Sequence, residues 1–226
     1  MLNGTDEKKQ YFNQYWKTRD ISSADLRSIQ RADIIQTLFE PDKNKKIIDV
    51  GCGRGTVMRQ LFQSGFNVNG CDISSDTIRE LSQSGFDAFL CDLETDPIPG
   101  KYDVLMCLEV LQQIFDPEAV IAKMRKALNP GGYLIISVPN EFHILSRLKL
   151  LLGKSHLGHF EESHIRLFSP GRARELFDKC GLTIDKTISV SVVPPKLKAL
   201  QAVGRFIARL IPGLFSLSQI YRLKIK

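Results

Sequence analysis

The chain has 226 residues, which suits one domain of ordinary size, and 43% of them are hydrophobic, enough for a buried core. No apolar run reaches the roughly 18 residues that span a bilayer, and the polar segment 1–10 does not resemble a signal peptide. Five cysteines without a CxxC pair argue against a disulfide framework or a zinc site. We therefore expect a cytoplasmic protein. The formal net charge is +6, but residues 194–226 hold seven Lys or Arg and no acid, so the rest of the chain is about neutral and we expect no binding to nucleic acid.

Helices and strands alternate along the first part of the chain. After helical structure over 5–40, the pattern predicts strands at 46–50, 67–71, 86–91, 102–108 and 133–138, helices at 56–63, 74–84 and 117–128, and a turn at 129–132. Strands that alternate with helices form a parallel sheet covered on both faces, and the wholly apolar segment 105–107 is typical of its centre. The sequence therefore predicts a doubly wound α/β fold.

The rhythm changes after residue 139. Residues 140–168 form a long connection with Leu-rich turns and all four histidines. Residues 196–215 then show apolar side chains at helical spacing, interrupted by Gly204 and Pro212. Around that helix the pattern predicts a helix at 170–180 and strands at 182–193 and 219–225.

A glycine cluster, Gly51, Gly53 and Gly55, follows the first strand and opens a helix. Glycines let a ligand approach the backbone, and a helix N-terminus presents free N–H groups to an anion. Asp49 precedes the cluster, and Asp72 ends the second strand, where a carboxylate can accept from both hydroxyls of a ribose. The alternatives are a plain strand-to-helix turn and, for Asp72, an N-cap. The G-x-G-x-G spacing departs from the dinucleotide fingerprint and suits a short zwitterionic tail rather than a pyrophosphate.

Five segments resemble, in the right order, the motifs of class I S-adenosylmethionine (SAM)-dependent methyltransferases: 47–55, 70–74, 91–94, 102–111 and 128–134. The resemblance implies SAM as cofactor and a seven-stranded, mostly parallel sheet of order 3-2-1-4-5-7-6 with the last strand antiparallel. Three further segments look most like the methionine-biosynthesis-associated methyltransferase-like group and its relatives in glycan gene clusters: 138–140, 147–148 and 164–168.

The resemblance also implies which residues hold the donor. Gly51 and Gly53 would cradle the amino-acid tail of SAM, Asp72 the ribose, and Asp92 with Leu93 the adenine. The complete set of donor-binding residues that we expect is Asp49, Gly51, Cys52, Gly53, Asp72, Ile73, Asp92, Leu93, Leu108 and Glu109.

Methyl transfer needs a base only when the acceptor group must lose a proton, as a hydroxyl does. The candidates for that base are His159 and His164, with Glu161, Glu162 and Glu109 behind them. His164 can instead be a turn or capping residue. Many relatives, including ubiquinone O-methyltransferases, read Glu-His where this chain has Gln112-Gln113, which removes a histidine near the donor. The spacing of these histidines and glutamates matches no familiar ligand set, so we expect no metal.

We expect one methyltransferase domain over residues 1–226, with an N-terminal helical cap (1–40), an acceptor-side insertion (140–168) and an amphipathic helical insertion (194–216). The cap carries three aromatic residues that either close over the donor or pack: Tyr11, Tyr15 and Trp16. The insertion 194–216 has basic flanks and no acid. It either covers the sheet, contacts a homodimer partner, or binds an anionic membrane surface peripherally.

The predicted activity is transfer of a methyl group from SAM to a small-molecule, glycan-linked or lipid-linked acceptor at a hydroxyl. Two other classes of function stay open. A non-catalytic SAM-binding or partner-regulating protein would bind the donor without turnover, which suits the Gln112-Gln113 departure. A nicotinamide-dependent oxidoreductase would share the fold and Asp72, but would bind NAD.

Overall fold

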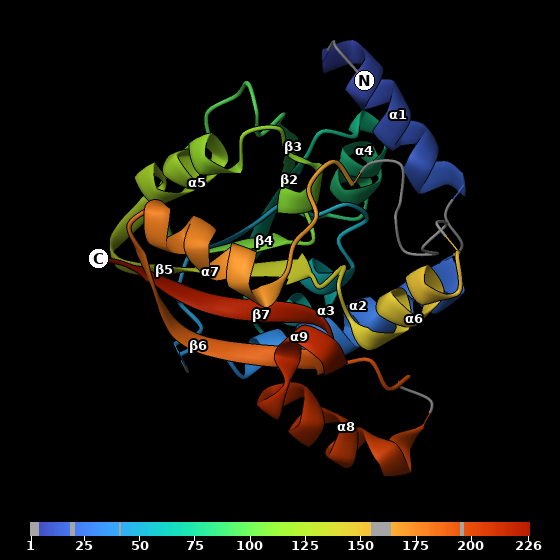
Figure 1. The fold of residues 1–226 in the computed structure, drawn as a ribbon. Coiled ribbons are helices and arrows are strands. Elements are labelled where there is room, and N and C mark those ends of the chain that lie inside the picture. The colour runs from blue at the N-terminus through green and yellow to red at the C-terminus, as the bar shows by residue number, and fades with distance from the viewer. Residues whose placement is uncertain (1–4, 19–20, 41, 155–163, 195–196) are drawn as a thin grey trace. The chain divides into compact units, whose positions relative to one another are not determined.

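The computed structural model of the chain describes residues 5–18, 21–40, 42–154, 164–194 and 197–226 (Figure 1). The chain divides into two compact units. The first unit comprises Met1–Leu108 with Ala119–Ile135, and the second comprises Glu109–Glu118 with Ile136–Lys226. The predicted single domain, with its cap and two insertions, stays a prediction.

The first unit is built from alternating helices and strands. In chain order its elements are α1 (Thr5–Thr18), α2 (Ile21–Gln36), β1 (Ile47–Val50), α3 (Thr56–Gln63), β2 (Val68–Asp72), α4 (Ser75–Gln83), β3 (Ala88–Leu90), β4 (Tyr102–Leu108), most of α5 (Pro117–Lys126) and the first part of β5 (Leu128–Pro139). Strand β1 pairs in parallel with β2 and with β4, and β2 pairs in parallel with β3. All four residues of β1 are buried, as expected for a parallel strand with helices on both faces.

The second unit contains the end of β5 and the later elements. These are the 3₁₀ helix η1 (Leu111–Gln113), α6 (Ile144–Leu151), α7 (Pro170–Lys179), β6 (Leu182–Ser191), α8 (Lys198–Leu210), α9 (Pro212–Phe215) and β7 (Ser216–Ile225). Strands β6 and β7, each ten residues long, pair antiparallel along their length through nine residue pairs. The rings of Phe177 on α7 and Tyr221 on β7 meet edge to face at 5.1 Å, so α7 is anchored on this pair of strands.

The strands form one seven-stranded sheet of order β3-β2-β1-β4-β5-β7-β6. This confirms the predicted fold class and strand order, including the antiparallel last strand. Strand β4 lies in the middle of the order, and Leu105, Met106 and Cys107 are completely buried, as their apolar run predicts. No helix among the described residues combines the length and the apolarity that crossing a bilayer requires.

Two regions differ from the pattern-based prediction. Strand β5 begins at Leu128, so the turn expected at 129–132 lies inside the strand; Asn129 donates from Nδ2 to Oδ1 of Asp103 at 2.8 Å and holds the strand's start beside β4. The helix expected over 196–215 is two helices, because Pro212 lacks a donor N–H and starts α9 instead of continuing α8. Gly204 does not interrupt α8.

Candidate functional site

The glycine loop after β1 is held in place by β2. The backbone nitrogens of Gly51 and Cys52 both donate to the carbonyl of Cys71, at 2.7 and 3.0 Å. Gly53 has a φ of +53°, a conformation that side-chain-bearing residues rarely adopt, and its nitrogen donates to Oδ2 of Asp72 at 2.8 Å. The loop therefore follows a fixed course next to the carboxyl end of β2.

Asp72 is a buried carboxylate at the end of β2. Its Oδ1 accepts from the backbone nitrogen of Ser74 at 2.9 Å. Burial raises the pKa of Asp72, while the backbone hydrogen bonds from Ser74, Gly53 and Ile73 act against that rise. The N-cap of α4 is Ser74, whose hydroxyl accepts from the nitrogen of Thr77, so Asp72 does not cap that helix. Its position suits the ribose contact that the resemblance implies.

Asp49 is a second buried carboxyl group, on β1. Only 2% of its surface is exposed, and its Oδ1 has no hydrogen-bond partner among the described residues. Burial, together with the neighbouring carboxylate of Asp72, raises the pKa of Asp49 to about 8. A cation that reached this carboxyl group would favour its ionised form. Asp49 thus fits the ammonium group of an amino-acid tail.

Asp92, after β3, has one satisfied and one unsatisfied oxygen. Its Oδ1 accepts from the nitrogen of Glu94 at 3.0 Å, whereas Oδ2 is buried and has no partner among the described residues. An exocyclic amine of a purine would supply the missing donor. Leu93 is 6% exposed and provides an apolar neighbour in the sequence. The pair matches the adenine contact that the resemblance implies.

The remaining expected donor residues contribute packing and backbone. Burial raises the pKa of the Cys52 thiol, which keeps it neutral. Ile73 is half-buried in the turn between β2 and α4, and Leu108 ends β4 with 8% of its surface exposed. These three residues offer no charge to a ligand.

Glu109 belongs to the second unit and follows Leu108 directly. It is the one non-glycine residue with positive φ, +56°, in the described part of the chain. Ser137 holds that conformation: its hydroxyl accepts from the nitrogen of Glu109 at 3.0 Å and donates to Oε1 at 2.8 Å. Strained backbone that is held by such contacts is typical of functional sites.

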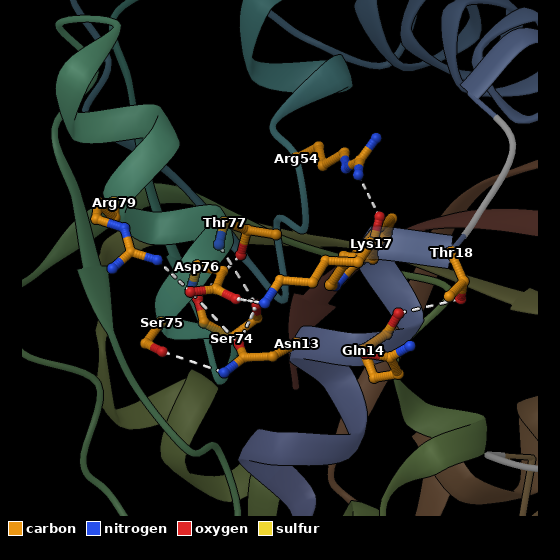
Figure 2. Close-up of polar contacts among 11 residues, drawn as sticks. Asn13, Gln14, Lys17, Thr18, Arg54, Ser74, Ser75, Asp76, Thr77 and Arg79 are labelled. Carbon is orange, nitrogen blue, oxygen red and sulfur yellow. Dashed lines mark hydrogen bonds and ion pairs between the residues drawn. The ribbon is translucent and has the colours of Figure 1, made fainter.

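Helix α1 lies over the glycine loop and the start of α4 (Figure 2). The indole of Trp16 packs so closely against Gly53 that a Cβ on that glycine would overlap the ring. Arg54 donates to the carbonyl of Trp16, and Lys17 forms an ion pair with Asp76 at 2.9 Å. The structure therefore brings Trp16, one of the three cap aromatics, to the expected tail-binding backbone.

Two further contacts tie α1 to the loops that follow β2 and β3. Oδ1 of Asn13 accepts from the hydroxyl of Ser74 at 2.7 Å (Figure 2), and Lys8 pairs with Glu94. Ser74 comes two residues after Asp72, and Glu94 comes two residues after Asp92. Sequence reasoning missed Asn13 and Lys8, because no periodicity shows which loops a helix touches.

In the second unit, His164 forms a pair with Glu141. Nδ1 of His164 lies 3.0 Å from Oε1 of Glu141, and the two side chains are 9% and 4% exposed. The backbone nitrogens of Ile165 and Arg166 donate to the carbonyl of Gln112 at 2.9 and 3.0 Å. His164 is not the cap of α7, because Ser169 has that role. The sequence analysis did not single out Glu141. Its one signal in the sequence was an acid two residues after a strand that leads into the histidine-rich connection.

Not every expected residue can be placed. His159, Glu161 and Glu162 lie outside the described residues. Within the described ranges, no three His, Cys, Asp or Glu side chains gather closely enough to hold a metal ion.

Known proteins match this chain in sequence and in structure. A family model described as a methyltransferase domain matches residues 22–187. A ubiquinone biosynthesis O-methyltransferase of Hydrogenovibrio crunogenus is 29% identical over 110 residues, 45% of this chain and 46% of that protein. The chain thus spans about half the length of the curated relatives it matches first.

Two solved structures share the fold. A SAM-dependent methyltransferase from Thermotoga maritima, described as a possible histamine N-methyltransferase, has a TM-score of 0.68 at 15% identity and covers 96% of this chain and 98% of its own. Magnesium protoporphyrin IX methyltransferase from Synechocystis, solved with bound S-adenosylhomocysteine (SAH), has a TM-score of 0.65 at 21% identity and covers 99% of this chain and 100% of its own. At these identities the likeness shows the fold.

Proposed function

Because this chain belongs to the methyltransferase domain family, we propose that it transfers a methyl group from SAM to a hydroxyl group of an apolar, lipid-linked or glycan-linked small molecule. The observation that carries the proposal is a pair of buried oxygens without partners among the described residues, Oδ1 of Asp49 and Oδ2 of Asp92. A buried oxygen without a donor costs about 1–3 kcal/mol. SAM carries an ammonium group and an adenine amine, one donor for each oxygen.

The chain's own residues would hold the donor in three places. Gly51 and Gly53 would face its amino-acid tail with Asp49 at the ammonium group, Asp72 would accept from the ribose hydroxyls, and Asp92 would accept from the adenine. SAM supplies a methyl group that is already activated by a positively charged sulfur. The protein's task is then mainly to align this methyl group with the acceptor oxygen.

His164 and Glu141 would remove the proton of the acceptor hydroxyl. With Nδ1–H donating to Oε1 of Glu141, the lone pair of Nε2 can accept that proton as the oxygen attacks. The carboxylate of Glu141 would then stabilise the imidazolium ion and hold the ring in one tautomer. This pair supports the proposal that His164 takes the role of the histidine that many relatives have at the position of Gln113. His159 stays a second proposed base.

The acceptor-side insertion supports an apolar acceptor. Helix α6 exposes Leu145, Leu148 and Leu151, at 47%, 48% and 82% of their surfaces. Apolar side chains that gather on one exposed helix often contact a ligand or partner. The Hydrogenovibrio relative is named for O-methylation in ubiquinone biosynthesis, which supports an oxygen acceptor. Membership of the glycan-cluster group within the family stays part of the proposal.

The test is turnover with methyl-labelled SAM against three acceptor classes: phenolic quinone precursors, lipid-linked sugars and free sugars. We expect label in the lipid-soluble product of one of the first two classes, together with SAH. The Asp92→Ala variant should need more SAM for the same rate. A chain that binds SAM but releases no SAH with any acceptor would contradict the proposed transfer and favour the non-catalytic alternative.

A further inference from the structure

Helix α8 turns its large apolar side chains to the outside. Leu200, Val203, Phe206 and Leu210 are 53%, 55%, 63% and 64% exposed. They recur at intervals of three and four residues, so they form one stripe along the helix. A surface helix normally packs such a stripe against its own core. In α8 the stripe is the uncovered face.

Small and polar residues hold the other face of α8 against the end of β6. Gln201 donates from Nε2 to the carbonyls of Val193 and Pro194, at 2.9 and 2.8 Å. A Cβ on Gly204 would lie 2.6 Å from both the hydroxyl oxygen of Ser191 and a methyl carbon of Val193, so no larger residue fits. These contacts fix the rotation of the helix about its axis. The stripe cannot turn inward without breaking them.

Positive charge follows one edge of the stripe. Arg205 and Arg209 are exposed, and among the described residues neither forms an ion pair. On β7, by contrast, Arg222 pairs with Asp185. Residues 194–226 contain no acid at all, so nothing on α8 itself can neutralise the two arginines. The uncovered face is therefore both apolar and cationic.

We propose that α8 docks onto an anionic lipid surface, with the stripe among the acyl chains and the arginines at the head groups. Interfacial helices combine these two contributions, apolar burial and attraction to anionic lipid. A second copy of this chain fits less well, because a two-fold contact through α8 would bring the same arginines together with no acid to pair them. This inference goes beyond methyl transfer and does not depend on it.

The test is co-sedimentation of the full chain with vesicles, without donor or acceptor. Vesicles of phosphatidylserine and phosphatidylcholine are compared with phosphatidylcholine alone, at low and high salt. We expect binding to the anionic vesicles at low salt, a marked loss at high salt, and weak binding to neutral vesicles.

Two double variants separate the contributions. Arg205→Gln with Arg209→Gln should weaken binding to anionic vesicles about 25-fold, since each basic residue near such a surface contributes about five-fold. Val203→Ser with Phe206→Ser should weaken it about ten-fold or more at either salt concentration. The matched control is Lys186→Gln with Lys224→Gln, which removes the same charge from β6 and β7 and should change binding less than about three-fold. Circular dichroism checks that each variant is folded.

Three results would overturn the proposal. The first is no binding of the parent to anionic vesicles at low salt. The second is equal weakening by the arginine variant and by the lysine control. The third is a dimer of the parent in sedimentation equilibrium that the Val203→Ser, Phe206→Ser variant loses, together with no binding of the parent to vesicles. Failure here would leave methyl transfer untouched, because the assay contains no SAM.

Discussion

Oδ2 of Asp72 accepts a hydrogen bond from the backbone nitrogen of Gly53 at 2.8 Å. The side chain of Asp72, at the end of β2, therefore helps to hold the glycine loop after β1. Removing the carboxylate frees a loop nitrogen as well as removing the proposed contact to the ribose. Substitutions at Asp72 should affect the amino-acid end and the ribose end of the donor together.

Asp72→Ala should weaken SAM binding by about 1.5–3 kcal/mol, the range for hydrogen bonds to a charged group. Asp72→Asn keeps one acceptor oxygen and should lose less. Isothermal titration calorimetry measures both, with the exposed Asp87→Ala as a control that should bind like the parent. An Asp72→Ala variant with parental affinity would show that Asp72 serves only the loop.

Asp49→Asn should weaken SAM binding and raise the free energy of unfolding near neutral pH. The folded-state pKa of about 8 lies above the ordinary value, so the folded protein resists ionisation and loses stability as the pH rises toward 8. The variant escapes that loss. The free energy of unfolding of the variant, minus that of the parent, should therefore increase with pH, by at most about 1.4 kcal/mol per pH unit below pH 8.

Denaturant unfolding at pH 5, 6 and 7 measures this difference, and calorimetry at the same pH values measures SAM binding. In the parent, SAM affinity should rise with pH, because the ammonium group needs the ionised carboxylate. In the Asp49→Asn variant that rise should disappear. A parent whose stability and SAM affinity are both flat over this range would contradict the role given to Asp49.

Trp16→Ala should speed the release of SAM. The indole lies against Gly53, so its loss uncovers the backbone expected to hold the amino-acid tail. We expect a dissociation rate about 5–10-fold higher, as for loss of a packed aromatic anchor. Chase of bound methyl-labelled SAM with excess unlabelled SAM measures the rate, because Trp16 is the chain's one tryptophan and its loss removes the fluorescence signal. The matched control is Gln14→Ala, an exposed position on the same helix. Equal release rates in both variants would leave Trp16 a packing residue.

His164→Ala should lower kcat about 100-fold or more while SAM affinity stays unchanged, because general-base catalysis contributes about 10²–10⁴-fold. Glu141→Gln should lower kcat less, because the ring keeps a hydrogen-bond partner while the imidazolium ion loses its anionic one. Once an acceptor is identified, the measurement is the rate of SAH formation at saturating SAM and acceptor. A variant without His164 that keeps the parental kcat would move the search for a base to His159.

The fold was largely predictable because its signals are local. Periods of 2 and 3.6 residues mark strands and helices. Asp49 lies within a strand that its own residues define, and the glycine cluster, Asp72 and Asp92 end or follow such strands. The start of β5 was not predicted, because the hydrogen bond from Asn129 to Asp103 joins two strands and no local pattern shows such a contact.

The parts that could not be predicted depend on which faces meet. The spacing of Leu200 and Phe206 shows that they share a face of α8, but whether that face is covered depends on Gln201 and Gly204 meeting the end of β6. In the same way the sequence does not show that Trp16 reaches Gly53. Periodicity defines a face and leaves its partner open.

The most direct test of the account is calorimetry of the purified chain with SAM, SAH and NAD at neutral pH. Asp49 and Asp92 each have a buried oxygen that lacks a partner among the described residues, and SAM would offer its ammonium group to one and its adenine amine to the other. We predict binding of SAM and SAH, weakened by Asp92→Ala, and no measurable binding of NAD. Tight binding of NAD without binding of SAM would contradict the account and assign the site to an oxidoreductase.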